Sequence, residues 1–133
     1  MRVLLDSDVL IDVALKRVPF FEAASEVIRW AEDNPGQAAV AWHTLSNIFY
    51  IVRSDMRPFI RNLLEFVEVA SIETRQAKQA LGFPMTDFED AMQTAAALAF
   101  DAHYIVSRNL RHYHKSAVPA ISPRQFLREV GRK

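Results

Sequence analysis

The chain has 133 residues, half of them hydrophobic, and its 16 basic and 16 acidic side chains leave no formal net charge. These properties fit one compact domain, residues 1–133, and the absence of cysteine excludes disulfides and thiolate zinc sites and suits a reducing cytoplasm. No apolar run approaches the length of a membrane span, and acidic residues interrupt the first positions, where a signal peptide would be apolar. We therefore expect a cytoplasmic protein with no membrane partner.

The two signs of charge are unevenly distributed along the chain. Residues 1–100 carry nine Lys/Arg and fourteen Asp/Glu, whereas residues 101–133 carry seven Lys/Arg and two Asp/Glu. This split permits an acidic site beside a basic surface, which suits a metal centre that handles a polyanion. A solvated face explains the basic end more simply, because the chain lacks the overall basicity of a dedicated nucleic-acid-binding protein.

Short apolar runs alternate with segments of helical periodicity. Strands are predicted at residues 3–5, 38–42, 103–106 and 118–121, with a short one inside 67–72. Helices are predicted from residue 9, over 21–33, 45–52, 58–66 and 75–81, after residue 86, and from residue 123. Thr44, Thr86 and Ser122 are the predicted helix caps. The alternation predicts an α/β fold in which helices cover both faces of a parallel sheet.

The strongest candidate for a functional site follows the first strand. The apolar residues 3–5 run directly into Asp6-Ser7-Asp8, and the carboxyl ends of buried parallel strands form the ligand crevice of open α/β sheets. Helix capping by Asp6 or Ser7, with Asp8 at the positive end of the helix dipole, explains one acid well and two poorly. We therefore expect Asp6 to act as a metal ligand or acid–base group, and Asp8 is the weaker candidate.

A second acidic cluster, Thr86-Asp87-Phe88-Glu89-Asp90, begins the late helix. Thr86 and Glu89 fit a capping box, and the dipole favours an acid at Asp87, whereas Asp90 has no such structural role and could be an ordinary exposed acid. The helix carries an apolar stripe that predicts its buried face, formed by Phe88, Ala91, Met92, Ala95, Ala96 and Ala99. Gln93 and Thr94 lie off this stripe and are expected outside that face.

Carboxylates from the strand end and the helix start can meet only if this helix packs beside the first strand. Their mutual repulsion would then favour a divalent cation, and ligation by oxygen alone favours Mg²⁺ or Mn²⁺ over zinc. Such ions polarise phosphoryl oxygens and generate hydroxide from bound water, so phosphodiester hydrolysis is the expected reaction class.

Four segments in this order resemble the PIN domain family, most closely its single-domain branch that includes VapC-type toxin ribonucleases. The segments are Val-Leu-Leu-Asp6-Ser-Asp-Val-Leu-Ile, Thr44-Leu-Ser-Asn-Ile-Phe-Tyr, Asp87-Phe-Glu-Asp90-Ala-Met-Gln and Ile105-Val-Ser-Arg-Asn109. The resemblance implies a three-layer α/β/α sandwich and an Mg²⁺- or Mn²⁺-dependent endoribonuclease that cuts RNA. It also implies an antitoxin protein as partner and a homodimer.

The resemblance carries over to individual positions. Asp6 matches the family's first acid and Asp90 the acid of its late helix, which implies that both bind metal, with Asp8, Asp87 and Asn109 as helpers. Asn47 stands where the family often has glutamate, and the region of its last acid offers Asn109 and, three residues on, His112. Ser107, Arg108 and Asn109 either contact phosphate or water, or form a turn. Four aromatic residues are expected in core or dimer packing rather than base stacking: Trp30, Trp42, Phe49 and Tyr50.

Two other functions compete with the ribonuclease. The neutral residues Asn47, Asn109 and His112 favour a PIN-like domain that has lost catalysis and binds RNA or a protein partner. The Asp6-Ser7-Asp8 run also fits an aspartate-nucleophile phosphatase of the haloacid dehalogenase type, although the downstream lysine and Gly-Asp motif of that site are missing.

Overall fold

The structure is a computed structural model that describes residues 1–132, and its centre is a five-stranded parallel sheet. The strands are β1 (Val3–Leu5), β2 (Ala38–Val40), β3 (Val67–Val69), β4 (Tyr104–Val106) and β5 (Ala120–Ile121). They lie in the order β3-β2-β1-β4-β5, and Leu4 of β1 pairs with Ala39 on one side and Ile105 on the other. Each strand lies within a segment that was predicted to be extended.

Most of the helices also lie where the periodicity of the sequence predicts them. They are α1 (Ser7–Ala14), α2 (Phe21–Asp33), α3 (Trp42–Val52), α4 (Arg57–Leu63), α5 (Thr74–Leu81), α6 (Phe88–Ala99) and α7 (Pro123–Glu129). A 3-10 helix, η1 (Leu110–Tyr113), was not predicted, because a single turn is too short to carry a periodic pattern. Within residues 1–132, no helix combines the length and the apolar character needed to cross a membrane.

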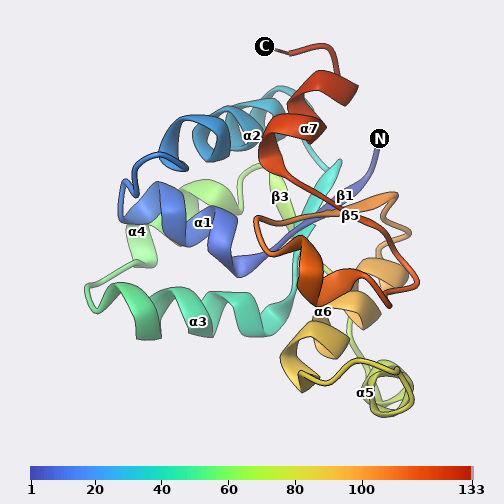
Figure 1. Ribbon diagram of the computed structural model, residues 1–133. Helices are drawn as coiled ribbons and strands as arrows, with labels where there is room; N and C mark the ends of the chain where they lie inside the picture. The colour runs from blue at the N-terminus through green and yellow to red at the C-terminus, as the bar shows by residue number, and fades with distance from the viewer. Residues whose placement is uncertain (133) are drawn as a thin grey trace.

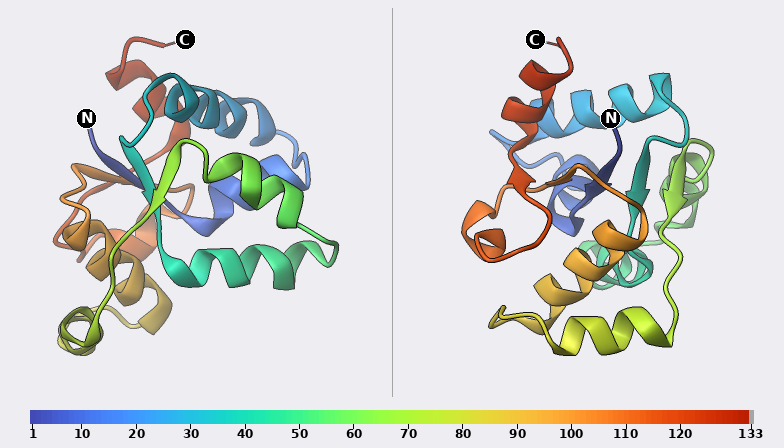
Figure 2. Two further views of the ribbon diagram at one scale, coloured as in Figure 1. Left: turned by 180° about the vertical axis from the view of Figure 1, so that it is seen from behind. Right: turned by 90° about the vertical axis from the view of Figure 1, so that its right-hand side faces the viewer.

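The side chains of the central strand point alternately into two separate cores, as the pleat of a strand requires. Val3 and Leu5 belong to the core that contains buried residues of α1, α2, α3, α4 and α7. Leu4 belongs to the core that contains residues of α6 and η1, and α5 packs against α6. Figure 1 shows α1, α2 and α4 on one side of the strands and α5 and α6 on the other, with α5 outermost in Figure 2. The predicted α/β/α sandwich is confirmed.

The order of the strands reverses at β1. The chain moves outward from β1 through β2 to β3, and then returns to the other side of β1 with β4 and β5. In open parallel sheets such a reversal leaves a crevice outside the carboxyl ends of the strands at that point. Asp6 directly follows β1 and Ser107 directly follows β4, so both residues reach this crevice.

Two of the predicted helix caps are wrong. Helix α3 begins at Trp42, and its cap is the extended residue Ala41, so Thr44 is a buried residue of the first turn. Helix α6 is capped by Asp87 and not by Thr86, because the carboxylate of Asp87 accepts the backbone N–H groups of the second and third helical residues. The third cap, Ser122 with the capping box to Gln125, is confirmed.

The buried face of α6 and the aromatic core also differ from the prediction. Gln93 and Thr94 are fully buried, because hydrogen-bonding partners from other elements cover their side chains. Phe88, which was expected on the buried face, is half exposed. Trp30 lies in the core and meets Phe126 edge to face with 4.9 Å between ring centroids. The other three aromatic residues are exposed, so the prediction of a core position is wrong for Trp42, Phe49 and Tyr50.

Candidate active site

Asp6 is the most heavily hydrogen-bonded carboxylate of the crevice. Its Oδ1 accepts hydrogen bonds from the Ser7 N–H (2.7 Å) and from Nε2 of Gln93 (3.2 Å). Its Oδ2 accepts from Oγ of Ser107 (2.8 Å) and from the hydroxyl of Tyr113 (3.0 Å). The neighbouring residue Ser7 and three residues that are distant in sequence therefore hold this one side chain in place, and all four donors are neutral groups.

Tyr113 is a donor that keeps its proton. Burial, followed by the negative charges of Asp6 and Asp90, raises the pKa of the Tyr113 hydroxyl far above its ordinary value. The hydroxyl therefore stays protonated near neutral pH and donates to Asp6. Tyr113 belongs to η1, the element that was not predicted from the sequence, so this contact could not be predicted either.

Asp8 lies beside Asp6 and is held by the loop that follows β4. Its Oδ2 accepts from the Arg108 N–H (3.1 Å), Nδ2 of Asn109 (3.1 Å) and Oγ of Ser107 (3.2 Å), whereas its Oδ1 is buried without a donor. Burial, followed by repulsion from Asp6, raises the pKa of Asp8 to about 7. Near neutral pH Asp8 therefore exchanges its proton readily.

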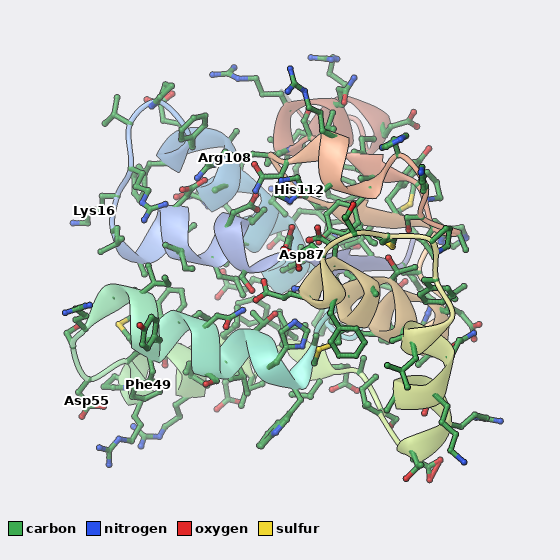
Figure 3. The ribbon with its side chains drawn as sticks, turned by 60° about the horizontal axis from the view of Figure 1, so that its bottom comes forward. Lys16, Phe49, Asp55, Asp87, Arg108 and His112 are labelled. Carbon is green, nitrogen blue, oxygen red and sulfur yellow. The ribbon has the colours of Figure 1, made fainter. Side chains whose placement is uncertain are left out.

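Asp90 reaches the same region from the first turn of α6. Burial, followed by the charge of Asp87, raises the pKa of Asp90 to about 6, and Asp6 contributes to the rise. The imidazole of His112 in η1 lies beside it, with 3.4 Å between Nδ1 and the Asp90 carboxylate. Figure 3 shows Asp87 at the start of α6 with His112 near it. The structure thus brings Asp90 toward Asp6, with Asp87 as the capping acid beside them.

A polar network that the sequence did not reveal connects α1, α3 and α6. Nε2 of Gln93 donates to Oγ1 of Thr44 (3.1 Å) as well as to Asp6. The Ser7 hydroxyl donates to the same Thr44 oxygen (3.1 Å), and Nδ2 of Asn47 donates to Oγ of Ser7 (3.2 Å). Only one signal pointed to Gln93, namely a polar residue one turn after Asp90 among the alanines of α6. Its Oε1 is buried without a donor.

Residues 107–109 make structural contacts within the protein. Besides the contacts to Asp8, the Arg108 guanidinium binds Asp12 of α1 in a bidentate pair, with 2.6 Å from Nε to Oδ2 and 3.0 Å from Nη2 to Oδ1. It also lies over the ring of Phe20, 4.0 Å from the centroid. Asp12 is only 1% exposed, so the cation of Arg108 compensates a buried charge.

The oxygen atoms of the crevice fit a hydrated metal ion better than a closed protein cage. Within residues 1–132, no three Asp, Glu, His or Cys side chains are grouped so that they could hold a metal. Two buried acceptor oxygens nevertheless lack a donor, Oδ1 of Asp8 and Oε1 of Gln93, and both belong to the network around Asp6. Mg²⁺ commonly keeps several waters and takes only one or two carboxylates from the protein, and unpaired acceptor oxygens are what such waters contact.

Comparison with known proteins agrees with this geometry. The family model described as PIN domain matches residues 2–111, whereas no curated protein matches the chain. The match covers Asp6, Asp8, Asp90 and Asn109 and ends just before His112. It does not support the phosphatase alternative. PIN domains are generally nucleases that act on nucleic acids and typically use divalent metals. With its parallel sheet and the acids gathered at the strand-order reversal, the chain belongs to the PIN domain family.

Proposed function

We propose that the chain is a divalent-metal-dependent ribonuclease that cleaves phosphodiester bonds in RNA. The observation that carries the proposal is the convergence of Asp6 and Asp90 in the crevice where the strand order reverses. Gln93, one turn after Asp90 on α6, donates to Asp6, and the charge of Asp6 contributes to the raised pKa of Asp90. Acids with perturbed pKa values that gather in a crevice are typical of catalytic sites.

Asp6, Asp8 and Asp90 would hold a hydrated Mg²⁺ or Mn²⁺, together with phosphate oxygens of the substrate. When bound, the ion supplies Lewis-acid polarisation of a phosphoryl oxygen and a water of lowered pKa. Asn47 and His112 add no fixed negative charge to this set, so we expect weaker metal affinity than in a site with acids at all four positions.

The other residues of the site position these carboxylates and the substrate. Asn109 holds the Asp8 carboxylate through its side-chain amide, and Asp87 orders the start of α6 by capping it. Asp87 and Asp90 line a cavity of about 280 Å³ whose lining also includes four basic or imidazole side chains: Arg111, His112, His114 and Lys115. Cationic groups beside an acidic site can orient a phosphodiester without occupying the metal position.

Cleavage of a fluorescently labelled single-stranded RNA with and without Mn²⁺ tests the proposal. We expect cleavage to require Mn²⁺, to stop on addition of EDTA, and to fall at least about 100-fold in Asp6→Asn and Asp90→Asn. Asp55→Asn is the control, because Asp55 is exposed and lies far from Asp87 and His112 in Figure 3. Equal cleavage rates for Asp6→Asn and Asp55→Asn would show that the acids at this crevice do not cut RNA.

A catalytically inactive RNA-binding domain is the second candidate, and the hydrogen bonding of Asp6 favours it. This carboxylate already accepts four hydrogen bonds, so it is stable in the crevice without a cation. Calorimetric titration with Mn²⁺ separates the two functions. Heat of binding that is lost in Asp6→Asn supports the nuclease, whereas RNA binding with no Mn²⁺ binding supports the inactive domain.

We propose further that the ribonuclease is the toxin of a toxin–antitoxin pair and forms a homodimer. The resemblance of the four segments to the single-domain toxin branch supports this role. Induced expression of the wild-type chain is then expected to stop bacterial growth, and Asp6→Asn to permit it. Sedimentation analysis of the purified chain tests the homodimer.

A further inference from the structure

A second cavity, of about 560 Å³, lies beside the acidic crevice and is lined mainly by apolar side chains. Its walls come from the residues after β2 and β3 and from helices α5 and α6, and several of them are alanines. We call it the Trp42 cavity. Its lining includes the aromatic residues Trp42 and Phe88 and the polar residues His43 and Gln76.

Two aromatic rings line this cavity and remain largely open to solvent. Trp42 is 70% exposed and Phe88 is 49% exposed, and each is the first residue of its helix. Thr44 and Asp90, two residues further along the same helices, belong to the acidic crevice. Two residues correspond to about 200° around an α-helix, so the cavity and the crevice adjoin opposite sides of the same two helix starts.

The cavity also contains hydrogen-bonding groups without a visible use in the fold. His43 lines the cavity, but its Nε2 is buried away from solvent and has no hydrogen-bond partner among residues 1–132. Burial lowers the pKa of His43, which keeps its ring neutral at pH 7, and the charges of Glu89 and then Asp6 act on the ring in the opposite direction. Oε1 of Gln76 already accepts a hydrogen bond from the backbone N–H of Glu73. The amide nitrogen of the same side chain remains available as a donor.

We propose that the Trp42 cavity binds one unpaired base of the RNA whose backbone lies at Asp6 and Asp90, an inference that rests on the proposed function. Aromatic side chains bind bases of single-stranded RNA by stacking, and polar groups read the base edge. Trp42 and Phe88 provide the stacking faces, and the side-chain amide of Gln76 provides the edge contact.

The chemistry of the lining favours a base over the other occupants of an apolar cavity. The lining contains no Lys or Arg, so a phosphate would find no counter-charge there, whereas the basic side chains lie at the neighbouring cavity beside Asp90. An apolar peptide side chain would cover the amide nitrogen of Gln76 without accepting a hydrogen bond from it, which is unfavourable. A nucleobase is flat, aromatic and neutral, and it carries hydrogen-bonding groups on its edge.

The test measures RNA affinity in the absence of cleavage. A labelled ten-nucleotide single-stranded RNA is titrated by fluorescence anisotropy, in EDTA, against the wild-type chain, Trp42→Ala and Phe88→Ala. We expect both variants to bind about 5- to 100-fold more weakly, as loss of one stacking contact does elsewhere. Tyr50→Ala is the matched control, because Tyr50 is 73% exposed on the same helix as Trp42 and does not line the cavity. Urea unfolding checks that all variants fold.

An RNA with one abasic position gives a second, independent arm. Moving the abasic position along the oligonucleotide should reveal one position at which wild-type affinity falls by the factor that Trp42→Ala loses. At that position Trp42→Ala should show no further loss, because base and ring act as a pair. The proposal is wrong if Trp42→Ala, Phe88→Ala and Tyr50→Ala bind RNA with equal affinity and the abasic effects are additive. A protein partner would then be the remaining candidate ligand of the cavity.

These outcomes are distinct from failure of the ribonuclease. If the wild-type chain shows no Mn²⁺-dependent cleavage but Trp42→Ala weakens RNA binding, the base site holds in an RNA-binding domain. If Mn²⁺-dependent cleavage requires Asp6 but Trp42→Ala binds RNA like Tyr50→Ala, the nuclease holds and the base site is wrong.

Discussion

Removal of the Arg108 side chain should destabilise the fold far more than removal of an arginine from a surface ion pair. Asp12 is 1% exposed, and both of its carboxylate oxygens are paired with the Arg108 guanidinium. Arg108→Ala would therefore leave a buried carboxylate without its main counter-ion. Removing one partner of a buried ion pair costs about 3–5 kcal/mol of unfolding free energy.

The structure favours the lower end of this range. Nη1 of Arg17 lies 3.8 Å from Asp12 and retains part of the compensation, and the Arg108 side chain is itself 24% exposed. The contact with Phe20 adds about 0.5–1 kcal/mol. We expect a loss of about 3 kcal/mol, which corresponds to a fall in Tm of about 10 °C for a domain of this size.

Urea unfolding of Arg108→Ala, with Arg57→Ala as the matched control, measures this difference. Arg57 pairs with Asp55 at 3.0 Å, but both side chains are mostly exposed, so its loss should cost less than about 1 kcal/mol. The double variant Arg108→Ala with Asp12→Asn should recover part of the loss, because it removes the unpaired charge. Equal losses for the two arginines, or no recovery in the double variant, would refute the assignment of a buried compensating pair.

Three further predictions concern the acids of the crevice. The raised pKa values of Asp8 (about 7) and Asp90 (about 6) mean that the folded chain retains protons which the unfolded chain has released. The unfolding free energy should therefore fall as pH rises from about 4 to 7, by roughly 1.4 kcal/mol per pH unit for one such carboxyl group. In urea titrations at pH 7.5, saturating Mn²⁺ should restore this stability. Tyr113→Phe should cost about 1–2 kcal/mol in the same assay, because one donor to the buried Asp6 carboxylate is lost, and an unchanged midpoint would contradict that contact. Asn47→Glu should tighten Mn²⁺ binding at least about 10-fold by calorimetry while lowering stability without metal, and unchanged affinity would show that position 47 does not face the ion.

Part of the site could be predicted because it depends on local patterns. Asp6 directly follows a buried strand, which places this acid at the carboxyl edge of any parallel sheet, whichever strands surround it. The capping box at Ser122 is equally local, because the capping residue and its partner are three positions apart. The cap of α6 was placed one residue too early, because Thr86 and Asp87 are both suitable capping residues and sequence alone does not separate them.

The amino-acid sequence by itself determined the alternation of strands and helices, and with it the α/β architecture and the position of Asp6. These features follow from hydrophobic periodicity, which acts between residues that are near in the chain. Only the tertiary structure decided that Gln93 and Thr44 are buried, that Tyr113 donates to Asp6, and that Trp42 stays outside the core. The reason is that a polar side chain can be buried only when distant segments supply its hydrogen-bond partners. The local hydrophobic pattern does not predict which distant residues those partners are.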